Sequence, residues 1–183
     1  MLNVDQQKEL LRIARKTIDL HLKEKKRFIY STEDEALRRN SGAFVSIHRG
    51  GQLRGCIGNI FPVKPLYETV IDCAISAATE DYRFEPLSLE ELAESSLEIS
   101  VLSYPELVRD INEIIIGKHG LIITQEYCKG LLLPQVATEY HWDRETFLTH
   151  TCIKAGLPRD AWKKGAKIEK FSAEVFSEEE LKG

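Results

Sequence analysis

A pair of adjacent glycines, Gly50 and Gly51, separates two strand-like segments and strongly constrains how this chain can fold. Gly-Gly is a preferred loop of tight β-hairpins, because glycine adopts positive φ angles without steric cost. The preceding segment, 43–48, has the composition of a strand, and segment 53–58 has the pattern of a second one. The sequence therefore predicts a β-hairpin around the two glycines.

The length of the hairpin loop decides which side chains share a face of the sheet. A two-residue loop pairs His48 with Leu53 and puts His48 on the face opposite Cys56. A three-residue loop instead places Phe44, Ser46 and His48 on the face of Cys56, and it gathers the aliphatic residues of both strands on the other face. We favour the three-residue loop, without assigning His48 as a base.

The second strand of the hairpin carries a thiol and a guanidinium. Because successive side chains alternate, Arg54 and Cys56 share a face and lie roughly 6–7 Å apart. A permanent cation at that range favours the thiolate, which attacks electrophiles or binds metal. Gly55 and Gly58 mark a bulge or a close approach by a ligand or another backbone. Cys56 and Arg54 are thus candidate catalytic residues and the two glycines candidate ligand-binding residues; the alternative is a small buried cysteine beside an ion-paired arginine.

The stretch Leu53-Arg54-Gly55-Cys56-Ile57-Gly58 resembles the signature of the AMMECR domain family. Further matches follow in order: Pro65-Leu66, Ala77-Ala78, Arg83-Phe84, Ile99-Ser100-Val101-Leu102, Gly117-Lys118-His119-Gly120-Leu121, Leu132-Leu133-Pro134-Gln135-Val136-Ala137 and Cys152-Ile153-Lys154-Ala155-Gly156-Leu157. The resemblance covers nearly the whole chain. One departure is Tyr82, where the family usually has proline between Asp81 and Arg83.

The resemblance implies a two-part α/β fold and a family whose molecular activity is unsettled. Stand-alone members resemble protein A of the three-protein AmmeMemoRadiSam system, whose other components are a Memo-type protein and a radical SAM protein. We therefore expect one component of a multi-protein enzyme system, with a cleft around residues 53–58 and Cys56 as a reactive thiol. The alternative is a non-catalytic binding or adaptor module for a Memo-type or radical SAM partner, and whether the chain is itself an enzyme stays open.

The remaining hydrophobic pattern predicts the other elements. In the first half these are a helix over 4–24, a buried helix from Pro65 to about 79, a short helix with a capping box of Ser88 and Glu91, and a strand over 97–102. In the second half they are a hairpin over 114–123, a turn near 129–130, a strand over 131–133, helices over 134–140 and from Asp143 to Gly156, and a strand over 168–176.

Each half of the chain thus runs hairpin, buried helical segment and strand. This order predicts an α+β fold of two interlocked α/β lobes with mostly antiparallel sheets. We expect a single AMMECR domain over 1–183, whose two subdomains meet at a cleft and divide near 104–112.

Four other residues are candidates for the site. His119 lies in a glycine-bounded turn, where an imidazole can act as acid or base or do nothing. Gln135 follows Pro134 at a helix start, where free N–H groups favour an anion, or simply cap the helix. Arg83 lines a cleft or pairs with Asp81 in a structural salt bridge, which we favour. Lys154 is retained as a ligand-binding candidate on its family match alone.

Composition narrows the class of partner. The net charge of −4 argues against nucleic acid or an anionic membrane as the main partner, since both reward excess lysine and arginine. No apolar run approaches the roughly 20 residues of a spanning helix, and no signal peptide is recognisable, so we expect a cytoplasmic protein. The four cysteines form no Cys-x-x-Cys pair, which predicts free thiols, and we expect neither metal nor cofactor. Cys73 and Cys152 lie among apolar residues of their predicted helices, so we expect both to be buried.

Overall fold

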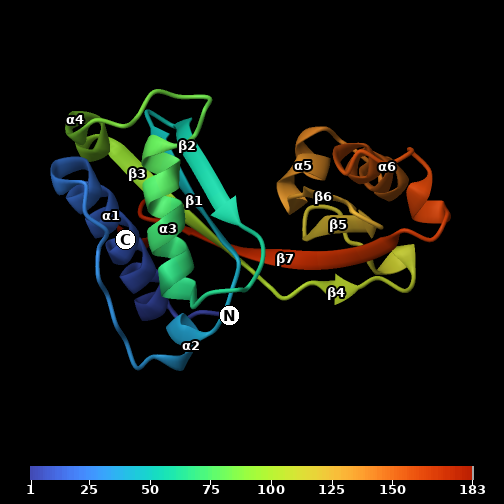
Figure 1. The fold of residues 1–183 in the computed structure, drawn as a ribbon, viewed down its shortest axis with the longest axis horizontal. Helices are drawn as coiled ribbons and strands as arrows, with labels where there is room; N and C mark the ends of the chain where they lie inside the picture. The colour runs from blue at the N-terminus through green and yellow to red at the C-terminus, as the bar shows by residue number, and fades with distance from the viewer. Residues whose placement is uncertain (183) are drawn as a thin grey trace. The chain divides into compact units, whose positions relative to one another are not determined.

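The computed structural model describes residues 1–182, which form two compact units. The first unit comprises Met1–Leu102 together with the chain from Glu174 onward, and the second, Ser103–Ala173, is inserted between them. Figure 1 shows the elements of both units in chain order, coloured from blue to red.

The first unit contains α1 (Val4–Glu24), α2 (Glu35–Arg38), β1 (Ala43–Arg49), β2 (Gln52–Asn59), α3 (Leu66–Thr79), α4 (Leu89–Ala93) and β3 (Ser95–Leu102). The second contains β4 (Glu106–Leu107), η1 (Ile111–Glu113), β5 (His119–Gln125), β6 (Cys128–Leu132), α5 (Pro134–Glu139), α6 (Arg144–Lys154) and η2 (Ala161–Lys163). The strand β7 (Lys167–Ser177) spans the second boundary between the units, and η3 (Glu180–Lys182) follows it.

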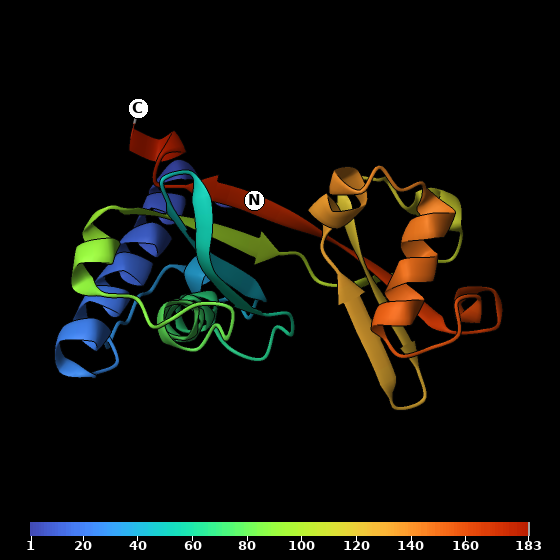
Figure 2. The ribbon, with the colours of Figure 1, turned by 90° about the horizontal axis from the view of Figure 1, so that it is seen from above.

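The sheet of the first unit has the strand order β2–β1–β3, and both pairings are antiparallel. Helices α1 and α3 cover one face of it (Figures 1 and 2). Alternation along β1 directs Val45 and Ile47 into the core beneath these helices, and both are fully buried. The predicted helix over 4–24 is confirmed as α1, which begins at a capping box between Asn3 and Gln6.

The predicted three-residue length of the first hairpin loop is wrong, although Ser46, His48 and Cys56 do share a face of the sheet as predicted. The loop has two residues, both glycines with positive φ angles of 58° and 76°, and His48 pairs with Leu53. A β-bulge then leaves Arg54 without a partner across the ladder, so that Ser46 pairs with Cys56. The extra residue puts Ser46, His48 and Cys56 on one face, as we had expected from a longer loop, but Leu53 pairs with His48 and does not join the apolar face.

The second unit is built in the same way. Strand β5 pairs antiparallel with β6 on one side and β7 on the other, and β4 pairs with β7. Helix α6 packs on β5 and β6, and its Phe147 and Leu148 are fully buried against Leu121 and Ile123 of β5. Asp143 caps α6 as predicted. The prediction of an α+β fold with antiparallel sheets and two similar lobes is confirmed.

The predicted second hairpin over 114–123 is wrong, as is the turn predicted near 129–130. The hairpin is β5–β6, which turns at Glu126 and Tyr127. Ile114 is fully buried in the core, but the Ile115 carbonyl accepts the N–H groups of Lys118 and His119, so the chain turns there. A run of three isoleucines lacks the alternation that identifies a strand. Here the run is hydrophobic because Ile114 packs in the core, and not because the segment forms a strand.

No helix within residues 1–182 combines the length and apolar character needed to cross a membrane.

Candidate functional site

Four chemically active side chains lie on the face of the first sheet that α1 and α3 do not cover. They are Ser46 and His48 of β1, Cys56 of β2 and Glu98 of β3, and we refer to them as the Cys56 cluster. Alternation places them opposite the buried aliphatic residues of the same strands. A thiol, a hydroxyl, an imidazole and a carboxylate thus occupy three neighbouring strands.

Ser46 is the centre of this cluster. It pairs with Cys56 on one side and with Glu98 on the other, and its Oγ donates a hydrogen bond to Cys56 Sγ at 3.2 Å. His48 lies two residues further along β1, with Nε2 at 3.9 Å from Glu98 Oε1. That nitrogen is buried and has no hydrogen-bond partner among residues 1–182.

The environment of Cys56 favours the neutral thiol. Burial raises the pKa of Cys56, and the charges of Asp81 and Glu98 act in the same direction. The hydrogen bond from Ser46 and the charge of Arg83 act in the opposite direction and only partly offset the burial. Arg83, rather than the expected Arg54, is therefore the cation that acts on this thiol.

An ion pair holds the backbone of Cys56 at the edge of the sheet. Asp81 Oδ2 accepts the backbone N–H of Cys56 at 2.9 Å, and Arg83 Nη2 donates to the Cys56 carbonyl at 3.4 Å. The two side chains meet at 2.7 Å, which confirms the predicted salt bridge. The Asp81 side chain is only 3% exposed, and its hydrogen bonds with Arg83 hold the pKa of its carboxyl far below the usual range. We call this pair the Asp81–Arg83 clip.

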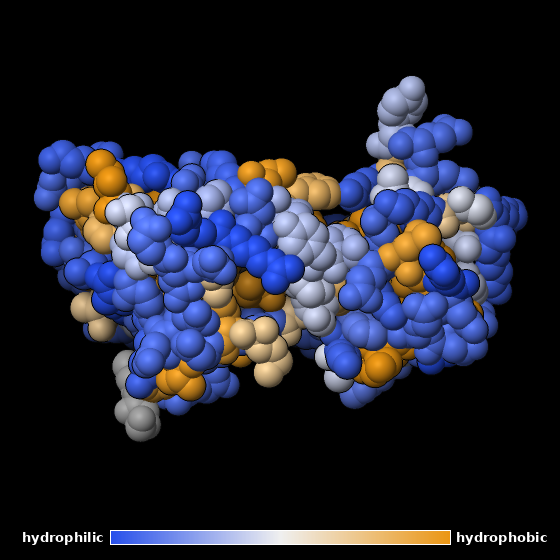
Figure 3. Space-filling view, turned by 90° about the horizontal axis from the view of Figure 1, so that it is seen from below, coloured by the Kyte–Doolittle hydropathy of each residue, from blue (hydrophilic) through white to orange (hydrophobic). Residues whose placement is uncertain are grey.

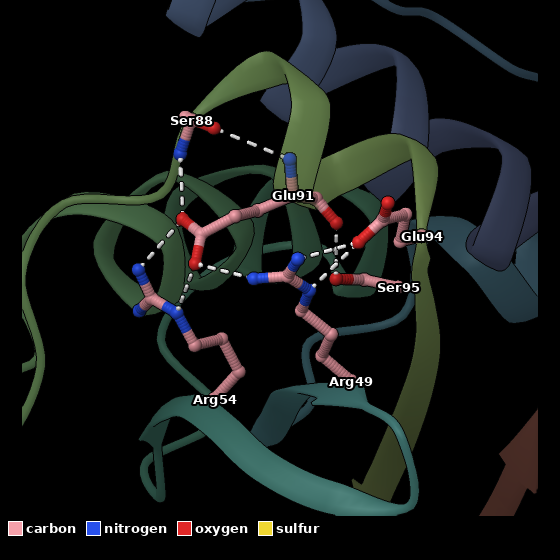
Figure 4. A network of polar contacts seen from close by, with 6 residues as sticks. All are labelled: Arg49, Arg54, Ser88, Glu91, Glu94 and Ser95. Atoms are coloured by element: carbon pink, nitrogen blue, oxygen red, sulfur yellow. Dashed lines mark hydrogen bonds and ion pairs between the residues drawn. The ribbon is translucent and has the colours of Figure 1, made fainter.

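Arg54 binds a carboxylate instead of the thiol, as Figure 4 shows. Its Nε and Nη2 donate to the two oxygens of Glu91 at 3.0 and 2.8 Å. Glu91 also accepts from Arg49 at 3.1 Å and from the backbone of Ser88 at 3.1 Å. These donors, Arg54 foremost, lower the pKa of Glu91 to about 2. Arg54 therefore fixes the hairpin to α4, the structural alternative that the sequence left open.

The protein itself fills the space beside both glycines of the signature. A Cβ atom on Gly55 would lie 2.3 Å from the carbonyl oxygen of Ala77, so this glycine lets the backbone of α3 approach β2. A Cβ atom on Gly58 would lie 2.2 Å from the ring of Phe44. Close approach of another backbone, one of the possibilities that the sequence allowed, accounts for Gly55, whereas the neighbour of Gly58 is a side-chain ring that the sequence did not predict.

The remaining candidates lie on three different elements of the second unit. His119 begins β5, and its Nδ1 accepts the backbone N–H of Ile115 at 3.0 Å; burial lowers the pKa of this imidazole. Gln135 is exposed in the first turn of the six-residue helix α5. Lys154 is exposed at the end of α6.

The cysteines are all free, and Cys73 and Cys152 are buried as predicted. Within residues 1–182, no group of three or more histidine, cysteine, aspartate or glutamate side chains is arranged to hold a metal ion.

Sequence reasoning missed Glu98 as a member of the site. The alternation of Leu97 and Ile99 already places Glu98 on the opposite face of its strand. What the sequence lacks is the order of the strands, because only the pairing of β1 with β3 brings Glu98 beside Ser46.

Comparisons with known proteins agree with this architecture. The sequence model of the AMMECR1 family matches residues 11–176, a range that includes the whole Cys56 cluster. The chain is 44% identical to protein Mbar_A1807 of Methanosarcina barkeri, covering 93% of this chain and 89% of that protein. It is 42% identical to a protein of Methanothermobacter thermautotrophicus, covering 97% of each.

A solved structure is also similar. The crystal structure of the uncharacterized protein PH0010 from Pyrococcus horikoshii superimposes with a TM-score of 0.82 at 42% identity, covering 93% of this chain and 90% of that one. The chain therefore belongs to the AMMECR1 family.

Proposed function

We propose that this protein is one component of a multi-protein enzyme system in which Cys56 acts as a reactive thiol. The observation that carries the proposal is the Cys56 cluster, in which the thiol lies 3.2 Å from the Ser46 hydroxyl and shares a face with an imidazole and a carboxylate. A cysteine that only fills space needs no such neighbours.

The environment of Cys56 suits a thiol that ionises when it reacts. Its raised pKa keeps it protonated at neutral pH, where a thiol is inert toward most electrophiles. The Ser46 hydroxyl and the Arg83 charge favour the thiolate as it forms. We propose a Memo-type protein and a radical SAM protein as the other components, on the strength of family membership.

A search for covalent adducts tests the proposed function. The protein is isolated from its native host into acid, and the four cysteine peptides are compared by mass spectrometry. We expect an added mass on the Cys56 peptide and none on that of the exposed Cys128, and loss of the cellular function in Cys56→Ser. An unmodified Cys56, together with a Cys56→Ser strain that behaves like wild type, contradicts the proposal.

The second candidate function is a non-catalytic adaptor for a Memo-type or radical SAM partner. It is favoured by two exposed apolar side chains of the edge of the sheet, Leu53 near the start of β2 and Phe61 just after its end. The fully exposed Tyr82, beside the clip, favours it too. The face in Figure 3 is mainly hydrophilic, with small hydrophobic patches that lie apart from one another.

Binding measurements separate the two functions. For an adaptor, Tyr82→Ala weakens capture of the purified partner, whereas Cys56→Ser leaves capture and cellular function intact. Tyr127→Ala serves as the control, because Tyr127 is equally exposed in the β5–β6 turn. Equal capture by wild type and Tyr82→Ala would remove the support for this surface.

A further inference from the structure

We propose that His48, with Glu98 beside it, accepts the proton of Cys56 when the thiol reacts. The inference rests on the proposed function and adds the base that such a thiol requires. It assigns a role to His48, which the sequence placed on the face of Cys56 without naming it as a base, and to Glu98, which the sequence did not connect with the signature.

The strand register brings His48 toward Cys56. His48 and Cys56 lie diagonally across the β1–β2 ladder, because Ser46 is the direct partner of Cys56. Diagonal positions are roughly 7–8 Å apart, which long or aromatic side chains can span. The bulge at Arg54 is essential, because an unbroken ladder from the two-residue loop would direct Cys56 to the opposite face.

Glu98 places a carboxylate beside the imidazole of His48. Its carboxylate lies 3.9 Å from His48 Nε2 and would balance the charge of an imidazolium. The same nitrogen is buried without a hydrogen-bond partner among residues 1–182, which is costly unless the atom has a task. On this view Glu98 acts by balancing the charge of the imidazolium, and His48 is the base.

The proton transfer can be written with iodoacetamide as the probe. Cys56 Sγ forms a bond to the methylene carbon as the carbon–iodine bond breaks and iodide leaves. The proton of the thiol passes to His48, and the imidazolium then returns it to solvent. The step needs no oxidant or reductant, and a natural electrophile with a leaving group would follow the same course.

Two charged groups near the thiol, Asp81 and Arg83, do not change state near neutral pH. The groups that face Cys56 are Asp81 and Arg83 from the loop between α3 and α4, and Glu98 from β3. Asp81 stays ionised because its pKa is depressed, and Arg83 stays protonated because its pKa is raised. A base effect at pH 7 that is lost in His48→Gln and only weakened in Glu98→Gln would therefore point to His48.

The test measures the rate at which iodoacetamide labels each cysteine of the full chain, resolved by mass spectrometry. At pH 7 we expect His48→Gln to slow labelling of Cys56 by about tenfold or more, a modest general-base effect. The rates should converge as the pH rises through the raised pKa of the thiol, because the thiol then ionises without help. Cys128 is the internal reference, and His21→Gln on α1 is the matched control that should label like wild type.

Two further variants keep the result interpretable. We expect Glu98→Gln to slow labelling less than His48→Gln does, and added imidazole to restore the rate in His48→Ala but not in wild type. Labelling at the wild-type rate in His48→Gln, or a loss that is equal at every pH, overturns this inference alone. A Cys56 that stays unlabelled in the folded wild-type protein overturns both this inference and the proposed function.

Discussion

At the scale of single residues, Asp81 is a nearly buried carboxylate that holds a guanidinium and a backbone N–H at once. A carboxylate in such a position stabilises the fold only while it is ionised. Its folded-state pKa is depressed, so its contribution is complete above the ordinary value of about 3.9 and is lost as the pH falls through the folded-state pKa.

We predict that Asp81→Asn lowers the free energy of unfolding at pH 7 by about 1.5–3 kcal/mol, the range for a hydrogen bond to a charged group. The difference from wild type should shrink progressively below pH 4. Urea unfolding at pH 7, 4 and 3 measures both effects. Asp72→Asn is the control, because Asp72 binds Lys64 and Arg27 at the surface and should cost below about 1 kcal/mol. Equal losses in the two variants would contradict the role of the clip.

At the scale of elements, Glu91 joins three parts of the first unit. It closes the capping box of α4 with Ser88 and receives Arg49 and Arg54 from the hairpin. Because the pKa of Glu91 is lowered to about 2, its contribution is present above about pH 4.3 and is lost as the pH falls toward 2.

We predict that Glu91→Gln destabilises the protein by about 1–2 kcal/mol at pH 7 through the weakened cap and the lost ion pairs. The exposed Glu85 of the preceding loop is the control position, and Glu85→Gln should change stability by less than about 0.5 kcal/mol. Urea unfolding compares the two. If Glu91→Gln changed the free energy of unfolding no more than Glu85→Gln does, the ion pair with Glu91 would not explain Arg54. The hypothesis that Arg54 is a catalytic residue would then be supported again.

Local chemistry fixes the elements that the sequence predicted well. The ends of α4 and α6 follow from caps at Ser88 and Asp143, whose side chains bond to backbone a few residues away. The predictions of the first hairpin loop and of the second hairpin were wrong because both features depend on tertiary packing. The bulge at Arg54 accompanies an ion pair with Glu91, far along the chain, and the isoleucine run is drawn into a core that no local signal announces.

The site followed the same division. Cys56 could be identified as a candidate from its neighbours in sequence. That the cation acting on it is Arg83 and not Arg54 could not be predicted in this way. Arg83 reaches Cys56 through a loop that follows α3, and Glu98 through strand order. Both are long-range consequences of the fold.

At the scale of the whole molecule, the two units have separate hydrophobic cores, and each contains one buried cysteine. Cys73 lies in the core of the first unit and Cys152 in the core of the second. Each thiol therefore reports when its own core opens to solvent.

We predict that both cysteines resist labelling in buffer and become labelled at different urea concentrations, because each core can open by itself. Pulse labelling across a urea gradient, read by mass spectrometry, gives the two midpoints, with the exposed Cys128 as the reference that labels throughout. Coincident midpoints would show that the units unfold as one cooperative body.

The Asp81–Arg83 clip has a consequence beyond the chemistry of the thiol. Strand β2 is the last strand at its side of the sheet, and an uncovered edge strand is a template on which other chains add strands and build fibrils. The clip occupies the outward N–H and C=O groups of Cys56, in the middle of that edge. The carboxylate and guanidinium thus block the pairing of a further strand at this point of the edge, which protects the protein against aggregation.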